Sequence, residues 1–225
     1  MAFPQALLID LDDTMFPESS YVESGFRAVA QFLEETRDLP ADYSFPSMMA
    51  FLELEGRGAI FDRIIERFEI RNSEGLVAEC VDVYRAHKPN IQAYEGVKGA
   101  LADLSDRYAL ALVSNGLPAM QQRKLDSLGF EDFFDAVVFC DAINAPKPAT
   151  QGLKQALDRL GVFPQDCVFI GDNPNTDGMA ASNAGVPYLR VRTERFGHLD
   201  MAAPQVSTFS EVPGYLSSHA EKLRL

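Results

Sequence analysis

Residues 6–14 have the sequence Ala-Leu-Leu-Ile-Asp-Leu-Asp-Asp-Thr, an apolar run that passes directly into three closely spaced acids. An apolar run of strand length without polar alternation is typical of a strand whose two faces are both covered by helices. Four further runs share this character, at residues 108–114, 136–140, 167–171 and 187–191. We therefore predict a parallel sheet whose first strand lies at residues 6–10.

Amphipathic segments separate most of these runs. Apolar residues recur there at helical spacing, in the groups Val97, Leu101 and Leu104; Met120, Leu125 and Leu128; and Leu153, Ala156, Leu157 and Leu160. Gly129 and Gly161 follow the second and third groups, as C-terminal caps of helices do. Alternating strands and helices predict an α/β fold built on a doubly wound parallel sheet.

The segment from residue 16 to residue 90 interrupts the alternation, because it contains no clear strand. Three apolar stripes, with Ser20 and Glu23 as a capping box before the first, predict a helical bundle. The expected organisation is a core of residues 1–15 and 91–225 with a helical cap at residues 16–90. A lid is the favoured role, since open α/β sheets bind ligands at the carboxyl ends of their strands. A helical decoration without a catalytic role is the alternative.

The chain is acidic, with a net charge of −13 over 225 residues. Such a chain repels phosphate backbones and anionic lipids, so we expect neither a nucleic-acid polymer nor a membrane as partner. The three cysteines, Cys80, Cys140 and Cys167, lack C-x-x-C spacing, which favours a reducing compartment. Because neither a signal peptide nor a membrane-spanning run is evident, a cytoplasmic protein is expected.

Acids gather where the first predicted strand ends, at Asp10, Asp12 and Asp13. Carboxylates this close repel one another unless a cation or protons intervene. Taken alone, the segment is equally consistent with a metal site and with a solvated acidic turn. Residues at the other strand ends are needed to decide between them.

Polar residues also follow the second and fourth predicted strands. At the end of the second, the Ser114 hydroxyl could hold a phosphoryl oxygen beside Asn115, although Ser-Asn-Gly is also an ordinary turn. After the fourth, Asp172 and Asp177 could supply a second wall of carboxylates or, alternatively, a turn with an N-capping aspartate. The glycine before them, Gly171, favours a functional site, because a glycine lets another group approach closely.

Lys147 lies between two prolines, which stiffen the backbone and would fix the direction of the ammonium group. An exposed loop lysine is the alternative. Acids, hydroxyl, lysine and acids thus follow one another in order, each at a predicted strand end. In this order the chain resembles the haloacid dehalogenase (HAD) superfamily, in the C1-capped phosphatase branch of its subfamily I. The helical insert stands where the family's C1-type cap stands.

The resemblance implies a role for each motif residue. Asp10 resembles the nucleophile that forms an aspartyl-phosphate, and Asp12 resembles the general acid and base. Ser114 resembles the hydroxyl that binds the phosphoryl group, helped by the backbone of the substrate-binding residue Asn115. Lys147 resembles the lysine that neutralises charge.

The resemblance also implies a metal, because the family uses Mg²⁺. Its ligands would be Asp10, the main-chain carbonyl of Asp12, and Asp172, with Asp177 as the partner carboxylate. Thr14 resembles the threonine that supports the turn, and we include it among the expected substrate-binding residues.

Asp12 favours one reaction over another. The superfamily's dehalogenases lack an aspartate two positions after the nucleophile, so Asp12 favours hydrolysis of a phosphate ester over cleavage of a carbon–halogen bond. The expected function is a Mg²⁺-dependent phosphatase for a small phosphorylated metabolite, a nucleotide or sugar phosphate, with a loose similarity to pyrimidine 5′-nucleotidases. A dehalogenase-type hydrolase of the same fold and a phospho-accepting signalling module are the alternatives.

Selection of the substrate is expected from the insert. Arg57 lies between Gly56 and Gly58, which could let its side chain approach a ligand, whereas Arg63 is more typical of a solvated helix face. A monomer or a homodimer is expected, because the insert could pair with another copy.

Overall fold

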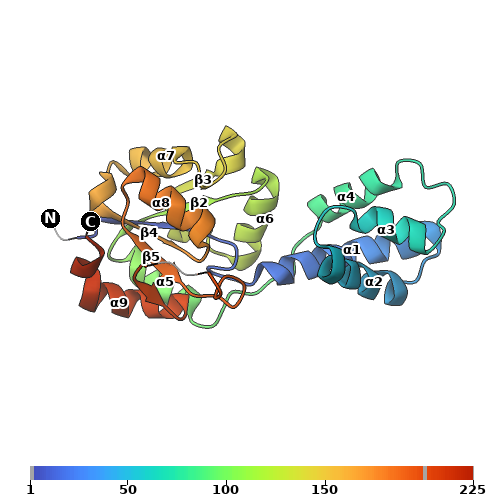
Figure 1. Ribbon diagram of the computed structural model, residues 1–225, viewed down its shortest axis with the longest axis horizontal. Helices are drawn as coiled ribbons and strands as arrows, with labels where there is room; N and C mark the ends of the chain where they lie inside the picture. The colour runs from blue at the N-terminus through green and yellow to red at the C-terminus, as the bar shows by residue number, and fades with distance from the viewer. Residues whose placement is uncertain (1–2, 200–201, 225) are drawn as a thin grey trace. The chain divides into compact units, whose positions relative to one another are not determined.

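The structure, a computed structural model, describes residues 3–199 and 202–224; the ends of the expected core, residues 1–2 and 225, lie outside this part. The chain divides into two compact units. One contains the residues up to Pro17 and those from Gln92 onward, and the other is Glu18–Ile91. These boundaries lie within two residues of those expected from the sequence. All of the described strands belong to the first unit (Figure 1).

The first unit is built on a parallel sheet of six strands in the order β3-β2-β1-β4-β5-β6. The strands are β1 (Ala6–Ile9), β2 (Ala109–Ser114), β3 (Ala136–Phe139), β4 (Cys167–Gly171), β5 (Tyr188–Val191) and β6 (Gln205–Val206). The first five match the five apolar runs, which confirms the predicted doubly wound α/β fold. The sixth was not predicted, because two residues are too few to give a pattern.

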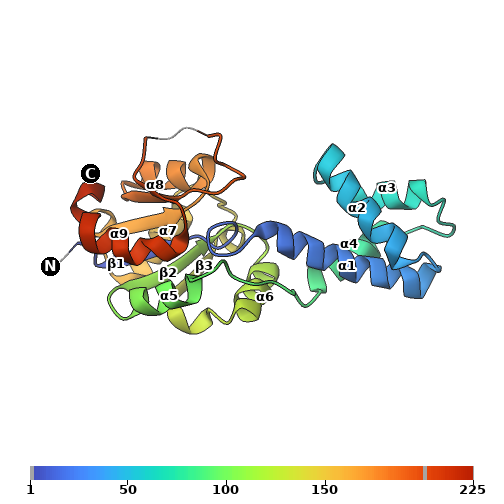
Figure 2. The ribbon, with the colours of Figure 1, turned by 90° about the horizontal axis from the view of Figure 1, so that it is seen from below.

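Helices cover both faces of this sheet. They are α5 (Val97–Ser105), α6 (Pro118–Leu128), α7 (Gln151–Leu160), α8 (Met179–Ala184) and α9 (Val212–His219). Short 3₁₀ turns lie at Glu131–Phe133, Cys140–Ile143, Pro164–Asp166, Phe209–Glu211 and Ala220–Leu223. Leu153 of α7 and Ala180 of α8 pack with Leu8 and Phe169 in one buried apolar cluster. Figure 2 shows α8 and α5 on opposite sides of the sheet.

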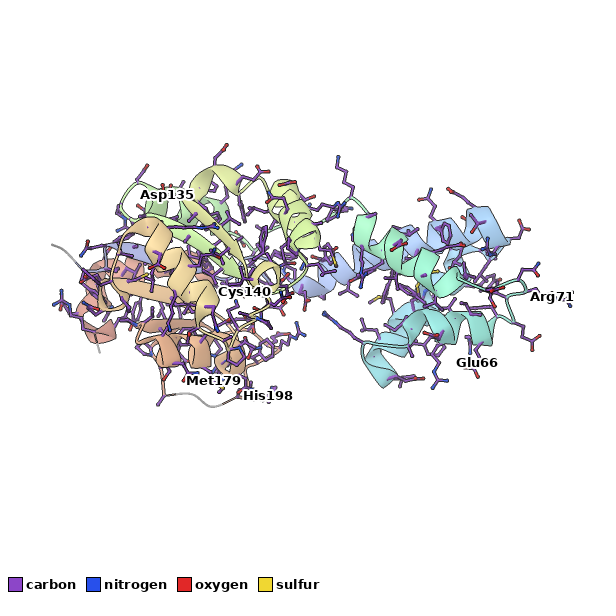
Figure 3. The ribbon with its side chains drawn as sticks, turned by 90° about the horizontal axis from the view of Figure 1, so that it is seen from above. Glu66, Arg71, Asp135, Cys140, Met179 and His198 are labelled. Carbon is purple, nitrogen blue, oxygen red and sulfur yellow. The ribbon has the colours of Figure 1, made fainter. Side chains whose placement is uncertain are left out.

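The second unit contains four helices, α1 (Glu18–Arg37), α2 (Ala41–Glu55), α3 (Ile60–Arg67) and α4 (Leu76–Ala86). The predicted stripes form its core, which includes Phe26, Ile64 and Leu76, whereas Glu66, labelled in Figure 3, is on the exposed face of α3. Among the described residues, no helix of either unit combines the length and the apolar character needed to span a membrane.

Two details of this unit differ from the sequence-based expectation. The capping box is wrong: α1 begins at Glu18, so Ser20 already lies inside the helix. An acid in the first turn is itself favourable there, because it faces the positive end of the helix dipole. Helix α2 was not predicted, since Pro46 interrupts its sequence and only Ser44 and Met48 are buried.

The register of the sheet brings three strand ends to one edge. Ile9 of β1 pairs with Leu112 of β2 on one side and with Ile170 of β4 on the other. The backbone N–H of Asp10 still donates to the carbonyl of Ile170, at 2.9 Å. Asp10 therefore follows the last paired residue of a central strand, flanked by the ends of β2 and β4.

Candidate active site

Three buried carboxylates, those of Asp10, Asp172 and Asp177, converge at this edge. Each can contribute one oxygen such that the three oxygens all lie within 4.8 Å of one another. Asp10 follows β1, Asp172 follows β4, and Asp177 lies in a π-helical turn, Pro174–Gly178. Asp10 and Asp172, which come from different strands, are thus close enough to share one cation. Oxygen atoms are the ligands that Mg²⁺ prefers.

Lys147 is the buried cation of this cluster. Its Nζ lies 2.5 Å from Asp10 Oδ1 and 2.9 Å from Asp177 Oδ1, and it donates to the carbonyl of Val113 at 2.9 Å. The interpretation as an exposed loop lysine is therefore wrong. The Asn115 side chain fixes the lysine backbone, because Oδ1 accepts from Lys147 N at 2.8 Å and Nδ2 donates to Lys147 O at 3.0 Å.

Burial shifts the protonation of these groups. It raises the pKa of Asp172 to about 8, with Asp10 and Asp177 adding to the effect. It also raises the pKa of Asp10 to about 7, although Lys147 favours the carboxylate. For Lys147, burial disfavours the charge, but Asp10 and Asp177 outweigh it and raise the pKa. A cation that binds here must therefore compete with protons.

Asp172 is held by hydroxyl groups. Thr14 Oγ1 lies 3.2 Å from Asp172 Oδ1 and 3.4 Å from Asp10 Oδ2, and Thr193 Oγ1 donates to Asp172 Oδ2 at 3.3 Å. Thr14 is fully buried between the two acids. In residues 3–199 and 202–224, no side-chain ion pair is made by the Asp172 carboxyl group, so its oxygens can bind a metal ion that displaces the proton.

Asp177 is placed by the strand end before it. Its carboxylate packs against Gly171, the last residue of β4, and accepts from the backbone N–H of Asn173 at 3.1 Å. Gly171 was expected to let another group approach closely, and that group is the carboxylate of Asp177.

Two residues that sequence reasoning missed hold Asp12, and one of them, Gln121, also contacts Ser114. Lys124 Nζ lies 2.7 Å from Asp12 Oδ1, and Gln121 Nε2 lies 2.8 Å from Asp12 Oδ2 and 2.7 Å from Ser114 Oγ. Both side chains are buried on α6, three residues apart. A polar pair at this spacing, next to the apolar Leu125 of the same helix, is the signal that could have identified them.

A second missed cation is Arg195, in the segment after β5. Its Nη1 lies 2.6 Å from Oδ2 of Asp13, the third acid of the first motif. The backbone of Asp13 has a positive φ of 58°. Arg195 lies 182 residues from Asp13 in the sequence, so no local pattern indicated this pair.

Arg57 and Arg63 both lie in the helical unit. Arg57 Nη2 is 2.8 Å from Glu18 Oε2, and the Arg57 side chain is 58% exposed. Arg63 pairs with Glu55 and Glu66 on the surface, as expected of a solvated helix face. The structure thus gives Arg57 an acidic partner within its own unit.

Comparison with known proteins assigns the chain to a family. A model of the haloacid dehalogenase-like hydrolases matches residues 4–185. The pyrophosphatase PpaX of Bacillus velezensis is 30% identical over 188 residues, which cover 80% of this chain and 79% of the relative. The glyceraldehyde 3-phosphate phosphatase of Methanopyrus kandleri is 29% identical over 203 residues, which cover 87% of each protein.

A solved structure shows the same fold. It is that of a HAD-superfamily hydrolase of subfamily IA from Geobacter sulfurreducens, with a TM-score of 0.72 and 21% identity, covering 94% of this chain and 96% of that one. The predicted family is confirmed, and with it a hydrolase rather than a signalling module. The chain therefore belongs to the haloacid dehalogenase-like hydrolases.

Proposed function

We propose that this protein is a Mg²⁺-dependent phosphatase that hydrolyses a small phosphate monoester, with Asp10 as the nucleophile. The observation that carries the proposal is the convergence of the carboxylates of Asp10, Asp172 and Asp177, two of which, Asp10 and Asp177, pair with the ammonium of Lys147. A carboxylate that attacks an anionic phosphate needs compensating positive charge close to the reacting atoms. Lys147 supplies part of it, and the excess of carboxylates offers a place for more.

The donor set suits magnesium. Asp10, the main-chain carbonyl of Asp12, and Asp172 would hold the ion, with Asp177 as the neighbouring carboxylate. All of these donors are oxygen atoms, as Mg²⁺ requires, and Asp172 has hydroxyl partners rather than a cation. When bound, Mg²⁺ would offset the repulsion between the nucleophilic carboxylate and the phosphate.

The chain's own residues account for the remaining chemistry. Asp10 attacks phosphorus, and the ester oxygen leaves with a proton from Asp12, so that an aspartyl-phosphate and an alcohol result. Asp12 then takes a proton from water, whose oxygen attacks the aspartyl-phosphate and releases inorganic phosphate and free Asp10. Lys147 and the Ser114 hydroxyl stabilise charge on the phosphoryl oxygens throughout.

The substrate class we propose is a nucleotide or sugar phosphate, with a pyrimidine 5′-nucleotidase as one form. The name of the Methanopyrus kandleri relative, a glyceraldehyde 3-phosphate phosphatase, supports a small phosphorylated metabolite. We further propose that Glu18–Ile91 acts as the cap, that Arg57 helps to select the substrate, and that a cytoplasmic monomer or homodimer is the working form. A dehalogenase is disfavoured by Asp12.

The test is hydrolysis of p-nitrophenyl phosphate with and without Mg²⁺, by the wild type and by Asp10→Asn. We expect Mg²⁺-dependent release of p-nitrophenol that the substitution abolishes, because an amide is a poor nucleophile. Asp132→Asn, at an exposed turn, is the matched control and should retain full activity. Turnover that survives Asp10→Asn would end the proposal, and metal-independent halide release from a 2-haloacid would favour the dehalogenase.

A screen of phosphorylated metabolites, read by phosphate release, would then identify the substrate. Preference for pyrimidine nucleoside monophosphates would support the nucleotidase form, whereas preference for phosphosugars would exclude it.

A further inference from the structure

Gln121 stands between two groups that the proposed reaction needs. Its Nε2 lies 2.8 Å from Asp12 Oδ2 and 2.7 Å from Ser114 Oγ. The side chain is 1% exposed and projects from the start of α6. A side-chain amide carries two hydrogens on one nitrogen, so it can donate to a carboxylate and to a hydroxyl at once.

The contact with Gln121 determines how Ser114 can act. Because Oγ accepts a hydrogen bond from Gln121, the hydroxyl hydrogen remains to be donated. It is donated to the backbone carbonyl of Asn115 at 3.2 Å, which is long for a hydroxyl donor. A phosphoryl oxygen is a stronger acceptor than this carbonyl, since charged acceptors form shorter and stronger bonds. Gln121 thus keeps Ser114 in the role of a donor.

The same amide limits the movement of Asp12. Gln121 holds Oδ2, and Lys124 Nζ holds Oδ1 at 2.7 Å. Both partners are buried and come from one rigid helix, so both oxygens of the carboxylate have fixed directions. A group that transfers protons is efficient only when it is held within hydrogen-bonding reach of the reacting oxygen.

The loop after β2 fixes Gln121 in turn. Gly116 has a φ of +116°, and a Cβ there would lie 3.1 Å from both Cδ and Oε1 of Gln121. The backbone of the loop therefore packs directly on the amide and leaves little space for another rotamer. This contact connects the end of β2, where Ser114 lies, with the helix that holds Asp12.

We propose that Gln121 is a positioning residue of the phosphatase reaction. Its amide orients the Asp12 carboxylate towards the leaving-group oxygen and directs the Ser114 hydroxyl towards the phosphoryl group. Gln121 acts through these two residues. The inference rests on the proposed function, and it adds a link between proton transfer and phosphoryl binding.

The test compares two substrates in Gln121→Met, which removes both donors at similar size. p-Nitrophenolate leaves without a proton, whereas an alkoxide needs one. The substrates are p-nitrophenyl phosphate and the alkyl phosphate that the wild type hydrolyses fastest. We expect kcat/KM to fall roughly 100-fold for the alkyl phosphate and roughly tenfold for the aryl phosphate, within the range of general acid catalysis. The ratio of the two losses does not depend on the fraction of folded enzyme.

Two further variants complete the design. Gln121→Glu keeps the shape but loses the donors, and it should show the same selective loss. Gln122→Met is the matched control, because Gln122 is the exposed neighbour that donates to Asp126 on the outer face of α6. For neither substrate should Gln122→Met change kcat/KM by more than twofold.

The positioning role would be overturned if kcat/KM fell equally for the two substrates in both Gln121 variants. It would also be overturned if kcat/KM fell no further than in Gln122→Met. A wild-type protein that hydrolyses neither phosphate would end the proposed function itself, and this inference with it. The two failures are therefore distinguishable, since the first requires an active wild type.

Discussion

A Cβ atom on Gly171 would lie 2.6 Å from Oδ2 of Asp177. The carboxylate of Asp177 therefore occupies the space that any other residue at the end of β4 would fill. Oδ1 of Asp177 lies 2.9 Å from Nζ of Lys147, and the same Nζ lies 2.5 Å from Oδ1 of Asp10. A single missing side chain thus sets the position of the acid that, with Asp10, holds the buried ammonium.

Gly171→Ala should displace Asp177 and disturb the pair with Lys147. Overpacking of a well-packed site costs about 1–3 kcal/mol, so we expect a comparable loss in the free energy of unfolding. Activity should fall more than stability suggests, because Lys147 would lose one of the two acids that orient it. Urea unfolding and Mg²⁺-dependent phosphate release measure the two effects.

Gly99→Ala is the control for this change. Gly99 lies in α5 with no atom near its virtual Cβ and no positive φ, so alanine should stabilise the protein by about 0.5–1 kcal/mol. If Gly171→Ala does not lower the free energy of unfolding any more than Gly99→Ala does, the close approach of Asp177 does not contribute to stability.

Lys147→Met should destabilise the metal-free protein, because it leaves Asp10 and Asp177 as buried neighbours without their cation. Removal of one partner from a buried ion pair costs about 3–5 kcal/mol. The loss should be larger at pH 8 than at pH 5, since burial raises the pKa of Asp10 and a proton can replace the lysine at low pH. Lys154→Met, at an exposed position of α7, should stay within about 0.5 kcal/mol of the wild type.

The stability of the metal-free protein should fall as the pH rises from about 4 to about 8. Burial raises the pKa of Asp172 from 3.8 to about 8, so in this window the folded state binds a proton that the unfolded state has lost. For each such proton, the free energy of unfolding falls by about 1.4 kcal/mol for every unit by which the pH rises. Chemical unfolding in the presence of a chelator, from pH 4 to pH 9, measures the slope. Asp172→Asn should flatten the dependence of the free energy of unfolding on pH. An unchanged slope would contradict Asp172 as the group that binds the proton.

Mg²⁺ should reverse this loss. Because the ion binds carboxylates and not carboxylic acids, its affinity should increase between pH 6 and pH 8, and protons should be released on binding. Calorimetric titration in two buffers of different ionisation enthalpy detects the released protons. Asp172→Asn should weaken Mg²⁺ binding at least tenfold, whereas Asp166→Asn, at the other end of β4, should leave it unchanged.

Arg57→Ala should separate substrate selection from stability. Its ion pair with Glu18 is exposed on the arginine side, and such pairs contribute about 0–1 kcal/mol, so the melting temperature should barely change. If Arg57 contacts the physiological substrate, KM for the best metabolite should rise while kcat is kept. Arg63→Ala, which removes two surface ion pairs from the same unit, is the control. Equal KM values in the two variants would remove Arg57 from the site.

Much of the fold follows from local patterns. Buried parallel strands must be apolar on both faces, so the runs that include Leu8, Leu112 and Phe169 identify themselves without any tertiary information. Glycines such as Gly129 mark helix ends because they adopt a positive φ. Strand β6 and the helix around Pro46 carry no comparable pattern. Strand β6 is defined by its pairing with β5, and Met48 anchors α2 in the apolar core of the second unit.

The candidate site is divided in the same way. The acids at strand ends, Asp10 and Asp172, could be predicted because parallel strands bring their carboxyl ends to one edge of a sheet. Lys147 alone gave the wrong impression, since a lysine between prolines is normally exposed. It is buried because Asp10 and Asp177 compensate its charge, and that compensation involves residues far away in the sequence.

The sequence by itself determined the α/β sheet, the helical insert and the order of the motif residues, because hydrophobic periodicity and strand-end chemistry are properties of neighbouring residues. Only the tertiary structure decided that Gln121 and Lys124 hold Asp12, that Gly171 admits Asp177, and that Arg195 reaches Asp13. Hydrogen bonds and ion pairs of this kind depend on distances of about 3 Å between side chains. The packing of whole helices and strands sets those distances, and no spacing along the chain encodes them.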